Sequence, residues 1–407
     1  MEYGLIGEKL GHSFSKIIHN ELFSYNYELK EIKPEEFDEF MRKADFKAIN
    51  VTIPYKEMVM EYLDEISEKA KEIGAVNVVV NDDGKLIGYN TDFLGLKGLI
   101  QKNNIDLKDK KVLILGSGGT SKTALAVCRD LGAQQAFRVS RSGGNGLITY
   151  DEAEKVNADI IINTTPCGMF PNIEGAAFNI DKFDGLSAVV DVVYNPLNTD
   201  LIVKAKAKGI KAVGGLYMLV AQAIFAAEKF GFKVKEEDFE RVYNKIFKEK
   251  QNLVLIGMPT SGKTTIGKIL SEELGREFID SDEEIVEKIG MSISEFFEKN
   301  GEAEFRKIEA QVIKEIALKQ GAVIATGGGV ILNKRNIELL KMNGKVIFLN
   351  RPLDMLLTSE DRPLSSDREL LKKRFEERHE IYKASADVEI IADSDIKTNV
   401  QKVKEGF

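Results

Sequence analysis

The segment Leu253-Val254-Leu255-Ile256-Gly257-Met258-Pro259-Thr260-Ser261-Gly262-Lys263-Thr264 decides the fold of the last part of the chain. An apolar run of strand length leads directly into a glycine-rich loop that ends in Gly-Lys-Thr, and an amphipathic stretch to residue 274 follows. Strand, loop and helix in this order form the P-loop pattern, whose backbone N–H groups bind the phosphates of a nucleoside triphosphate. The segment therefore predicts an α/β domain with a parallel sheet and a site for ATP.

The positions of this loop have distinct expected roles. Its backbone cradles the phosphates, Lys263 bridges the β- and γ-phosphate oxygens, and the hydroxyl of Thr264 ligates Mg²⁺. The predicted ATP-binding residues are Gly257, Met258, Pro259, Thr260, Ser261, Gly262, Lys263, Thr264 and Thr265.

A second glycine-rich loop, of a different pattern, lies in the first half of the chain. The apolar run 112–115 precedes Gly116-Ser117-Gly118-Gly119-Thr120-Ser121, and the helical stretch 122–131 follows it, as in a dinucleotide-binding fold. The next strand, 136–139, ends before Ser140-Arg141-Ser142, where an arginine favours the 2′-phosphate of NADP over NAD. A surface arginine without a ligand is the alternative. The predicted cofactor-binding residues here are Gly116, Ser117, Gly118, Gly119, Thr120, Ser140, Arg141 and Ser142.

The composition is that of a globular protein with more than one domain. A chain of 407 residues is too long for one ordinary core, and 43% of its residues are hydrophobic and 30% charged. A net charge of -8 argues against a general binder of nucleic acid or anionic membranes. The two cysteines lack metal-ligand spacing, and no apolar stretch is long enough to span a membrane. We expect a cytoplasmic protein that acts on small molecules.

Runs typical of strands alternate with amphipathic helical runs along the whole chain. This alternation predicts an α/β protein with parallel sheets and crossover helices. One domain boundary is expected after the charged helix 236–250 and another near residues 104–110, which divides the chain into 1–104, 105–249 and 250–407. The expected strand runs are 48–53, 112–115, 159–163, 188–193, 253–256, 322–325 and 346–349.

Four polar clusters precede the dinucleotide loop, and each alone could be a cap or a turn. They are Gly11-His12-Ser13-Phe14-Ser15, Asn50-Val51-Thr52-Ile53-Pro54-Tyr55-Lys56, Gly74-Ala75-Val76-Asn77 and Asn90-Thr91-Asp92. Three more follow the loop: Asn163-Thr164-Thr165-Pro166, Asp191-Val192-Val193-Tyr194-Asn195-Pro196 and Gly215-Leu216-Tyr217-Met218-Leu219-Val220-Ala221-Gln222. In this order the clusters resemble shikimate dehydrogenase over residues 1 to about 247.

The resemblance implies a substrate-binding domain at 1–104 and a Rossmann-type NADP-binding domain at 105–249, whose last helices return to the substrate domain. It implies that Lys56 donates to the ketone oxygen while Asp92 orients the lysine and balances its charge. A surface salt bridge is the alternative role of this pair. The resemblance assigns Thr164 and Gly215 to the cofactor, and to the substrate pocket Ser13, Ser15, Asn50, Thr52, Asn77, Tyr194 and Gln222.

Motifs downstream of the P-loop resemble shikimate kinase over about 251–407. They are Phe278-Ile279-Asp280-Ser281-Asp282, Gly301 to Glu309, Thr326-Gly327-Gly328-Gly329, Arg362-Pro363-Leu364 and Arg378 to Tyr382. The resemblance implies that Asp280 reaches the Mg²⁺ shell through water and that Asp282 accepts or orients the reacting hydroxyl. It implies further that Arg306 and Arg378 bind the substrate carboxylate, that Gly327, Gly328 and Gly329 approach the ring, and that Arg362 covers ATP.

Simpler roles exist for several of these kinase residues. Asp280 or Asp282 could cap a helix that begins near Glu283, and a cap and a ligand can coexist. The glycine triplet could be only a turn, and Arg306 could pair with Glu302 or Glu309 on its own helix.

Together the two resemblances imply a bifunctional enzyme of aromatic amino-acid biosynthesis. The first half would reduce 3-dehydroshikimate to shikimate with NADPH, and the second would phosphorylate shikimate to shikimate 3-phosphate with ATP and Mg²⁺. One alternative is a quinate-type dehydrogenase joined to a kinase of another small acid. The other alternative is that one half is a degenerate binding module. The sequence leaves the oligomeric state open.

Overall fold

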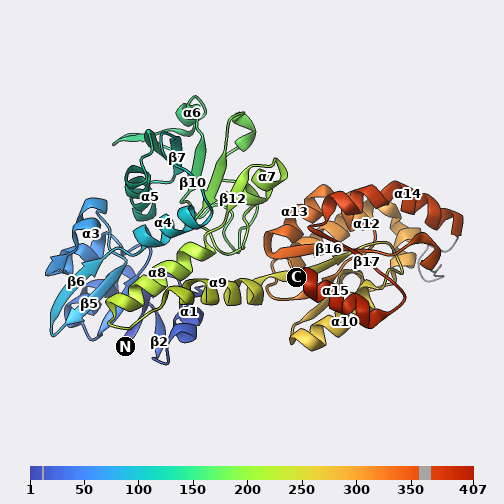
Figure 1. The fold of residues 1–407 in the computed structure, drawn as a ribbon, viewed down its shortest axis with the longest axis horizontal. Helices are drawn as coiled ribbons and strands as arrows, with labels where there is room; N and C mark the ends of the chain where they lie inside the picture. Colours follow the sequence, from blue (N-terminus) through green and yellow to red (C-terminus); the bar gives the residue numbers. More distant parts are fainter. Residues whose placement is uncertain (12, 357–367) are drawn as a thin grey trace. The chain divides into compact units, whose positions relative to one another are not determined.

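The chain forms two compact units. The computed structural model describes residues 1–11, 13–356 and 368–407. Contacts within the chain define a first unit, Met1–Phe247, and a second unit, Lys248–Phe407. Helices cover the sheets in both units, so the predicted α/β class is confirmed (Figure 1).

The first sheet of the first unit is mixed, with the strand order β2-β1-β3-β5-β6-β4. β1 pairs in parallel with β2 and β3, whereas β5 lies antiparallel to both β3 and β6. The alternation predicted parallel sheets, whereas this sheet is mixed, because a tight turn at Asp83 and Gly84, both with positive φ, joins β5 and β6 as a hairpin. The strands are β1 (Tyr3–Gly7), β2 (Tyr27–Glu31), β3 (Ala48–Val51), β4 (Glu65–Ile66), β5 (Val78–Asp82) and β6 (Lys85–Tyr89).

The second sheet is parallel throughout, with the order β12-β11-β10-β7-β8-β9. From β7 the chain adds β8 and β9 on one side of the sheet and then returns to add β10, β11 and β12 on the other side, so the order switches between β7 and β10. Ligands of open α/β sheets bind at such a point, outside the carboxyl ends of the strands. The strands are β7 (Lys111–Leu115), β8 (Gln135–Val139), β9 (Leu147–Ile148), β10 (Ile160–Asn163), β11 (Ala188–Asp191) and β12 (Lys211–Val213).

Both faces of the second sheet are buried, because successive side chains of a strand point to opposite faces. Val112 and Ile114 pack in one apolar cluster with helices α4 and α5, whereas Leu113 and Leu115 pack in another with α7. The helices of this unit are α1 (Ser15–Leu22), α2 (Pro34–Lys43), α3 (Glu68–Ile73), α4 (Asp92–Lys102), α5 (Gly119–Asp130), α6 (Tyr150–Ala153), α7 (Asp200–Ala207), α8 (Leu216–Lys229) and α9 (Glu236–Lys250), the last of which crosses into the second unit.

The second unit contains one parallel sheet with the order β14-β15-β13-β16-β17. Every residue of the central strand β13 is buried, as expected for a strand covered on both faces. Its strands are β13 (Asn252–Ile256), β14 (Phe278–Asp280), β15 (Val323–Ala325), β16 (Gly344–Asn350) and β17 (Val388–Ile391). Its helices are α10 (Lys263–Leu274), α11 (Ser281–Ile289), α12 (Ile293–Ala317), α13 (Lys334–Asn343), α14 (Arg368–Ser385) and α15 (Ile396–Gly406).

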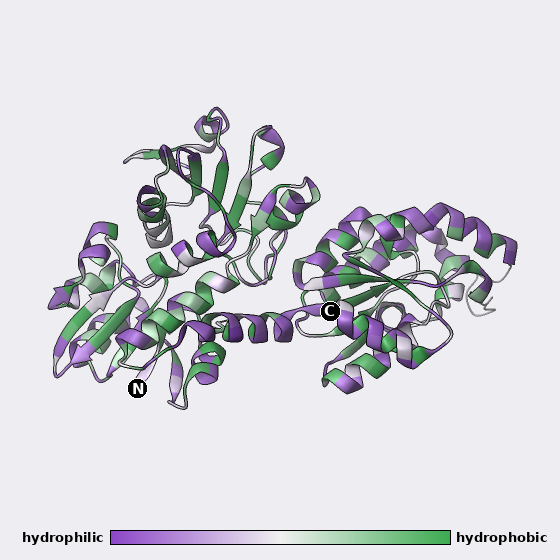
Figure 2. Ribbon diagram, viewed as in Figure 1, coloured by the Kyte–Doolittle hydropathy of each residue, from purple (hydrophilic) through white to green (hydrophobic). Residues whose placement is uncertain are grey.

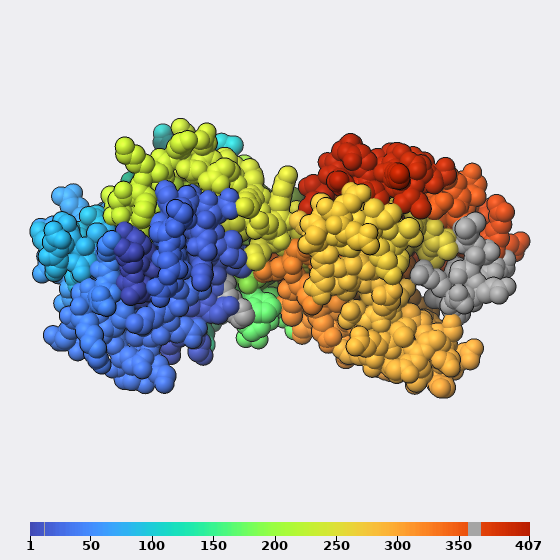
Figure 3. All heavy atoms as spheres, turned by 90° about the horizontal axis from the view of Figure 1, so that it is seen from below, coloured from blue at the N-terminus to red at the C-terminus, as the bar shows by residue number. Residues whose placement is uncertain are grey.

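Hydropathy follows this layering within each unit. The strands are mostly hydrophobic, and the helices carry hydrophilic residues along part of their length (Figure 2). In the first unit, atoms of the N-terminal segment adjoin those of α8, in keeping with the packing of α1 on α8 (Figure 3). No helix in the described parts of the chain is long and apolar enough to cross a membrane.

Candidate active sites

The first glycine loop leaves the carboxyl end of β7 and opens α5. Gly116 has a φ of 124°, and a Cβ atom there would lie 2.6 Å from Thr164 Oγ1, so only glycine fits beside this threonine. A Cβ atom on Gly118 would meet nothing within 4 Å, which leaves open space at the positive end of the helix. Open space and free N–H groups at this position suit a dinucleotide diphosphate.

Arg138, on β8, holds this loop, although the sequence offered no signal for it. Its Nε donates to Ser121 Oγ at 3.0 Å and its Nη2 donates to the carbonyl of Ser117 at 2.6 Å. Burial lowers the pKa of Arg138, against the opposing effect of Glu57.

The other predicted cofactor residues follow the carboxyl ends of strands of the same sheet. Ser140 and the exposed residues Arg141 and Ser142 follow β8, and the Ser140 hydroxyl accepts a hydrogen bond from the Gly143 N–H at 3.0 Å. Thr120 lies in the first turn of α5, next to Gly119. Gly215 precedes α8, where a Cβ atom would lie only 2.1 Å from the Val192 carbonyl oxygen.

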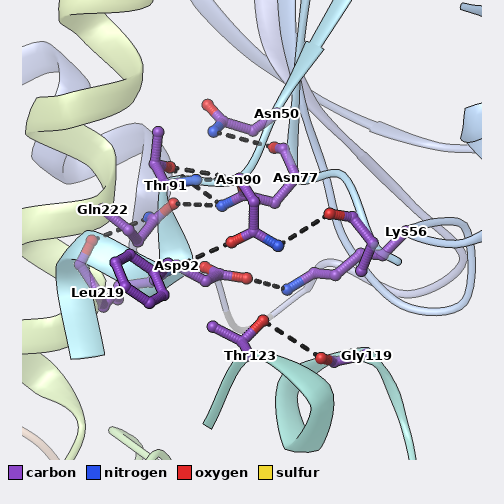
Figure 4. A network of polar contacts seen from close by, with 12 residues as sticks. Asn50, Lys56, Asn77, Asn90, Thr91, Asp92, Gly119, Thr123, Leu219 and Gln222 are labelled. Carbon is purple, nitrogen blue, oxygen red and sulfur yellow. Dashed lines mark hydrogen bonds and ion pairs between the residues drawn. The ribbon is translucent and has the colours of Figure 1, made fainter. Parts of the chain in front are cut away.

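A buried ion pair lies beside the loop. Lys56 Nζ is 2.6 Å from Asp92 Oδ2, and the two side chains are only 15% and 9% exposed (Figure 4). A Cβ atom added to Gly119 would come within 3.8 Å of Lys56 Cβ, so the start of α5 adjoins the lysine. The low exposure argues against the surface salt bridge that the sequence left open.

Asn77 is the centre of a polar network next to this pair (Figure 4). Its Nδ2 donates to Thr91 Oγ1 at 3.1 Å and to Gln222 Oε1 at 3.4 Å, and its Oδ1 accepts from the Thr91 N–H at 2.7 Å. Asn90 donates to the Ala75 carbonyl at 2.9 Å and fixes the turn before α4. The network thus joins β5, α4 and α8.

Glycine allows the two helices of this network to approach each other closely. A Cβ atom on Gly95, in α4, would lie 2.7 Å from the carbonyl oxygen of Met218 and 3.0 Å from Gln222 Cβ, both in α8. The crossing therefore places Gln222 close to the first turn of α4, which begins at Asp92.

The remaining predicted substrate residues divide between two groups. Asn50 accepts from the buried hydroxyl of Tyr27 at 2.8 Å and donates to the Asn77 carbonyl at 3.5 Å, while Thr52 follows β3. Ser13 donates to Ser15 Oγ at 3.1 Å. Ser13 also hydrogen-bonds the hydroxyl of Tyr194, whose pKa is raised by burial. Tyr27 was not predicted, because it lies on a different strand from the amide it orients.

The P-loop of the second unit follows β13, the central strand of its sheet. Lys263 Nζ donates to the carbonyls of Gly257 and Met258, each at 2.9 Å, which folds the lysine over the loop. The loop borders a cavity of about 370 Å³. The cavity is lined by Thr260, Ser261, Gly262, Lys263, Thr264, Thr265, Ile266, Asp280, Asp282, Thr326, Arg351, Asp393, Ser394, Ile396 and Asn399.

Oxygen atoms that suit Mg²⁺ gather at one side of this cavity. Thr264 Oγ1 donates to Asp280 Oδ2 at 2.8 Å, and a hydroxyl beside a carboxylate is a donor set that Mg²⁺ prefers. Asp280 Oδ1 accepts from the Asp282 N–H at 3.0 Å, so Asp280 also caps α11. The helix begins at Ser281, two residues earlier than expected. The described residues contain no group of three His, Cys, Asp or Glu side chains that could hold a metal ion.

The glycine triplet after β15 gathers the other predicted kinase residues. A Cβ atom on Gly327 would lie 2.5 Å from Asp282 Oδ1, one on Gly328 would lie 2.9 Å from Pro259 Cδ, and one on Gly329 would lie 2.3 Å from Arg306 Nη1. The triplet therefore packs against a carboxylate, the P-loop and a guanidinium group at once.

Arg306 is already paired on its own helix, as the sequence had left open. Its Nη1 lies 2.9 Å from Glu309 Oε2 and its Nη2 lies 2.9 Å from Glu302 Oε1. Burial lowers the pKa of Arg306, but the charges and hydrogen bonds of Glu309 and Glu302 have a larger effect together, so the pKa is raised. Burial also raises the pKa of Glu309, against the opposing effect of Arg306.

Helix α14 contributes two side chains to the triplet. Arg378 Nη1 donates to the Gly328 carbonyl at 3.1 Å, and the fully buried Tyr382 donates to the same oxygen at 2.6 Å. Tyr382 is the last residue of the motif Arg378 to Tyr382, but its role was not predicted. Arg362, which was expected to cover ATP, lies outside the described residues.

These sites define the class of the protein: a dinucleotide-binding reductase fold in the first unit and a P-loop kinase fold in the second. The family model "Shikimate dehydrogenase substrate binding domain" matches residues 5–79, and the model "Shikimate kinase" matches residues 259–405. The chain belongs to the shikimate dehydrogenase family and continues into a shikimate kinase domain, so it combines two enzymes of the shikimate pathway.

Individual relatives support the dehydrogenase part of this assignment. The chain is similar to shikimate dehydrogenase (NADP(+)) of Clostridium beijerinckii, with 41% identity over 56% of this chain and 90% of the relative. The crystal structure of shikimate dehydrogenase 1 from Peptoclostridium difficile is 36% identical, with a TM-score of 0.58 over 60% of this chain and 98% of that one. The Thermus thermophilus enzyme in complex with NADP(H) and shikimate is 27% identical, with a TM-score of 0.55 over 60% of this chain and 99% of that one.

Proposed function

We propose that the first unit reduces 3-dehydroshikimate to shikimate with NADPH and that the second unit phosphorylates the 3-hydroxyl of shikimate with ATP and Mg²⁺. One observation carries the proposal. Each glycine loop adjoins a polar group suited to the matching chemistry, Lys56 beside Gly119 in one unit and Asp282 beside the cavity of the P-loop in the other.

In the reductase, the chain supplies the proton and NADPH, when bound, supplies the hydride. Lys56 Nζ donates a proton to the ketone oxygen as that oxygen becomes an alkoxide. Asp92, 2.6 Å away, orients the ammonium group and balances its charge. The low exposure of both side chains strengthens the electrostatic interaction between them.

Neutral hydroxyl and amide groups recognise the ring hydroxyls of the substrate. A buried donor or acceptor left unmatched costs free energy, so such a pocket rejects analogues that lack a hydroxyl. The fixed amide of Asn77 and the hydrogen bond from Tyr27 to Asn50 keep these groups in one orientation. The residues we assign to this pocket are Ser13, Ser15, Asn50, Thr52, Asn77, Tyr194 and Gln222.

In the kinase, ATP with Mg²⁺ supplies the phosphoryl group when bound. Asp282 accepts the proton of the substrate hydroxyl or orients that hydroxyl, and Lys263 balances charge on the phosphates. Thr264 and Asp280 are the side chains that would hold Mg²⁺. Arg306 and Arg378 bind the substrate carboxylate, and Gly327, Gly328 and Gly329 let the ring approach the backbone. Arg362 belongs to this proposal by sequence alone.

We also propose the domain limits 1–104 for substrate binding, 105–249 for NADP binding and 250–407 for the kinase. The separate first and second sheets, and the division of contacts at residues 247 and 248, support these limits.

Two assays of the full-length chain test the proposed function. NADPH oxidation is followed with 3-dehydroshikimate, and ATP with Mg²⁺ is then added and the product identified by mass. We expect shikimate in the first step and shikimate 3-phosphate in the second. NADPH oxidation with quinate-type substrates only, or the absence of a phosphorylated product, would contradict the proposed function.

A further inference from the structure

A third arginine lies next to the two that the proposed function assigns to the substrate carboxylate. Arg374 and Arg378 are one helical turn apart on α14, and residues four apart lie on the same face of a helix. Arg378 reaches the glycine triplet through its bond to Gly328, and Arg306 packs against Gly329. The charges of Arg378 and Arg306 both act on Arg374, so the three guanidinium groups lie close to one another.

The hydrogen bonds of this cluster leave one buried donor without an acceptor. Arg374 Nη1 is buried and has no hydrogen-bond partner among the described residues. The nearby carboxylates of Glu302 and Glu309 are already bonded to Arg306, at 2.9 Å in each case. A buried N–H group of a charged side chain without an acceptor costs free energy, which an incoming anion would recover.

The charges around Arg374 also favour an anionic ligand. Burial lowers its pKa most, and the like charges of Arg378 and Arg306 lower it further, whereas Glu302 and Glu377 act in the opposite direction. An arrangement of like charges that is unfavourable by itself becomes favourable when a carboxylate enters between them.

We infer that Arg374 is a third arginine of the carboxylate site and that its free Nη1 hydrogen-bonds the carboxylate of the kinase substrate together with Arg378. This inference rests on the proposed kinase function. Because Arg306 also pairs with Glu302 and Glu309, Arg374 adds a donor to the site beside Arg306 and Arg378.

The test compares variants of the full-length chain in the kinase reaction. Arg374→Met removes the charge but keeps an apolar stem, and Lys373→Met, an exposed neighbour on the same helix, is the matched control. Each variant is assayed with shikimate and with its uncharged carboxamide, at saturating ATP and Mg²⁺. We expect Arg374→Met to raise KM for shikimate about tenfold and to reduce the preference for the carboxylate over the carboxamide by a similar factor. KM for ATP should be unchanged, and the control should behave like the wild type.

An unchanged KM for shikimate, or an equal loss with both substrates, would overturn the role of Arg374. If Arg374→Met also loses ATP binding, Arg374→Gln, which is polar but uncharged, decides: a rise of KM for shikimate with a reduced preference for the carboxylate supports the inference, and an unchanged KM refutes it. A wild-type chain that phosphorylates no shikimate would instead refute the proposed kinase function.

Discussion

The carboxylate of Asp282 lies against the backbone of Gly327, so that a Cβ atom on Gly327 would come 2.5 Å from Asp282 Oδ1. No other residue type fits at this position without moving the carboxylate. The glycine after β15 therefore allows the Asp282 carboxylate to lie directly against the backbone.

Gly327→Ala should displace Asp282 and slow the kinase. We expect kcat/KM for shikimate to fall about a hundredfold, since a displacement of about 1 Å of a catalytic group has effects of this size. Reductase activity of the same chain is the internal control. Kinase kinetics within twofold of the wild type would show that the close packing is not required.

Lys56→Met should abolish most of the reductase activity and spare the kinase. Loss of a general acid typically costs about a thousandfold in rate. Lys47→Met, which breaks an exposed ion pair with Glu2, is the matched control and should keep both activities. Loss of both activities in a folded Lys56→Met variant would contradict the independence of the two sites.

Arg138→Leu should weaken NADPH binding without affecting the ring substrate. The variant loses the bonds to Ser117 and Ser121, and the glycine loop loses its support from β8. We expect KM for NADPH to rise about tenfold, with KM for 3-dehydroshikimate unchanged. The control is Arg129→Leu, an exposed residue of α5. Equal effects of the two variants would count against a specific role of Arg138.

The buried His19 should make the chain less stable in acid. Burial lowers its folded-state pKa from 6.5 to about 3, so the unfolded chain takes up a proton near pH 6.5 and the folded chain does not. Stability is therefore fully present above pH 6.5 and is lost as the pH falls toward 3. Between pH 7 and pH 5 this group should cost about 2 kcal/mol of unfolding free energy.

Urea unfolding at pH 7 and pH 5, followed by circular dichroism, measures this loss. His19→Phe keeps a ring that can stack on Tyr27, and it should lose less stability on acidification than the wild type by about the same 2 kcal/mol. An equal loss in both proteins would show that His19 is protonated in the folded state.

Much of the fold was predictable from local patterns. The apolar runs became strands at nearly the expected residues, for example β7 (Lys111–Leu115) and β13 (Asn252–Ile256), because they are buried on both faces. The helices α5 and α10 begin earlier than expected, at Gly119 and Lys263, because the glycine loops lead directly into the first helical turn. The hairpin of β5 and β6 was missed, although Asp83-Gly84 is a turn signal.

The site was predictable only where its residues stand in contiguous motifs. Tyr27 and Arg138 act on residues that other elements carry, and no local pattern reveals such contacts. The roles of the motif residues stay predictions, since hydrogen bonds within the chain do not identify a ligand.

Two successive reactions on the same ring by one chain leave two marks on a single product molecule. The most direct measurement uses NADPH deuterated at both C4 positions, together with 3-dehydroshikimate, ATP and Mg²⁺, and analyses the product by mass spectrometry. We expect shikimate 3-phosphate molecules that each carry one deuterium and one phosphoryl group. Deuterated shikimate without phosphate, or phosphorylated product without deuterium, would contradict this expectation.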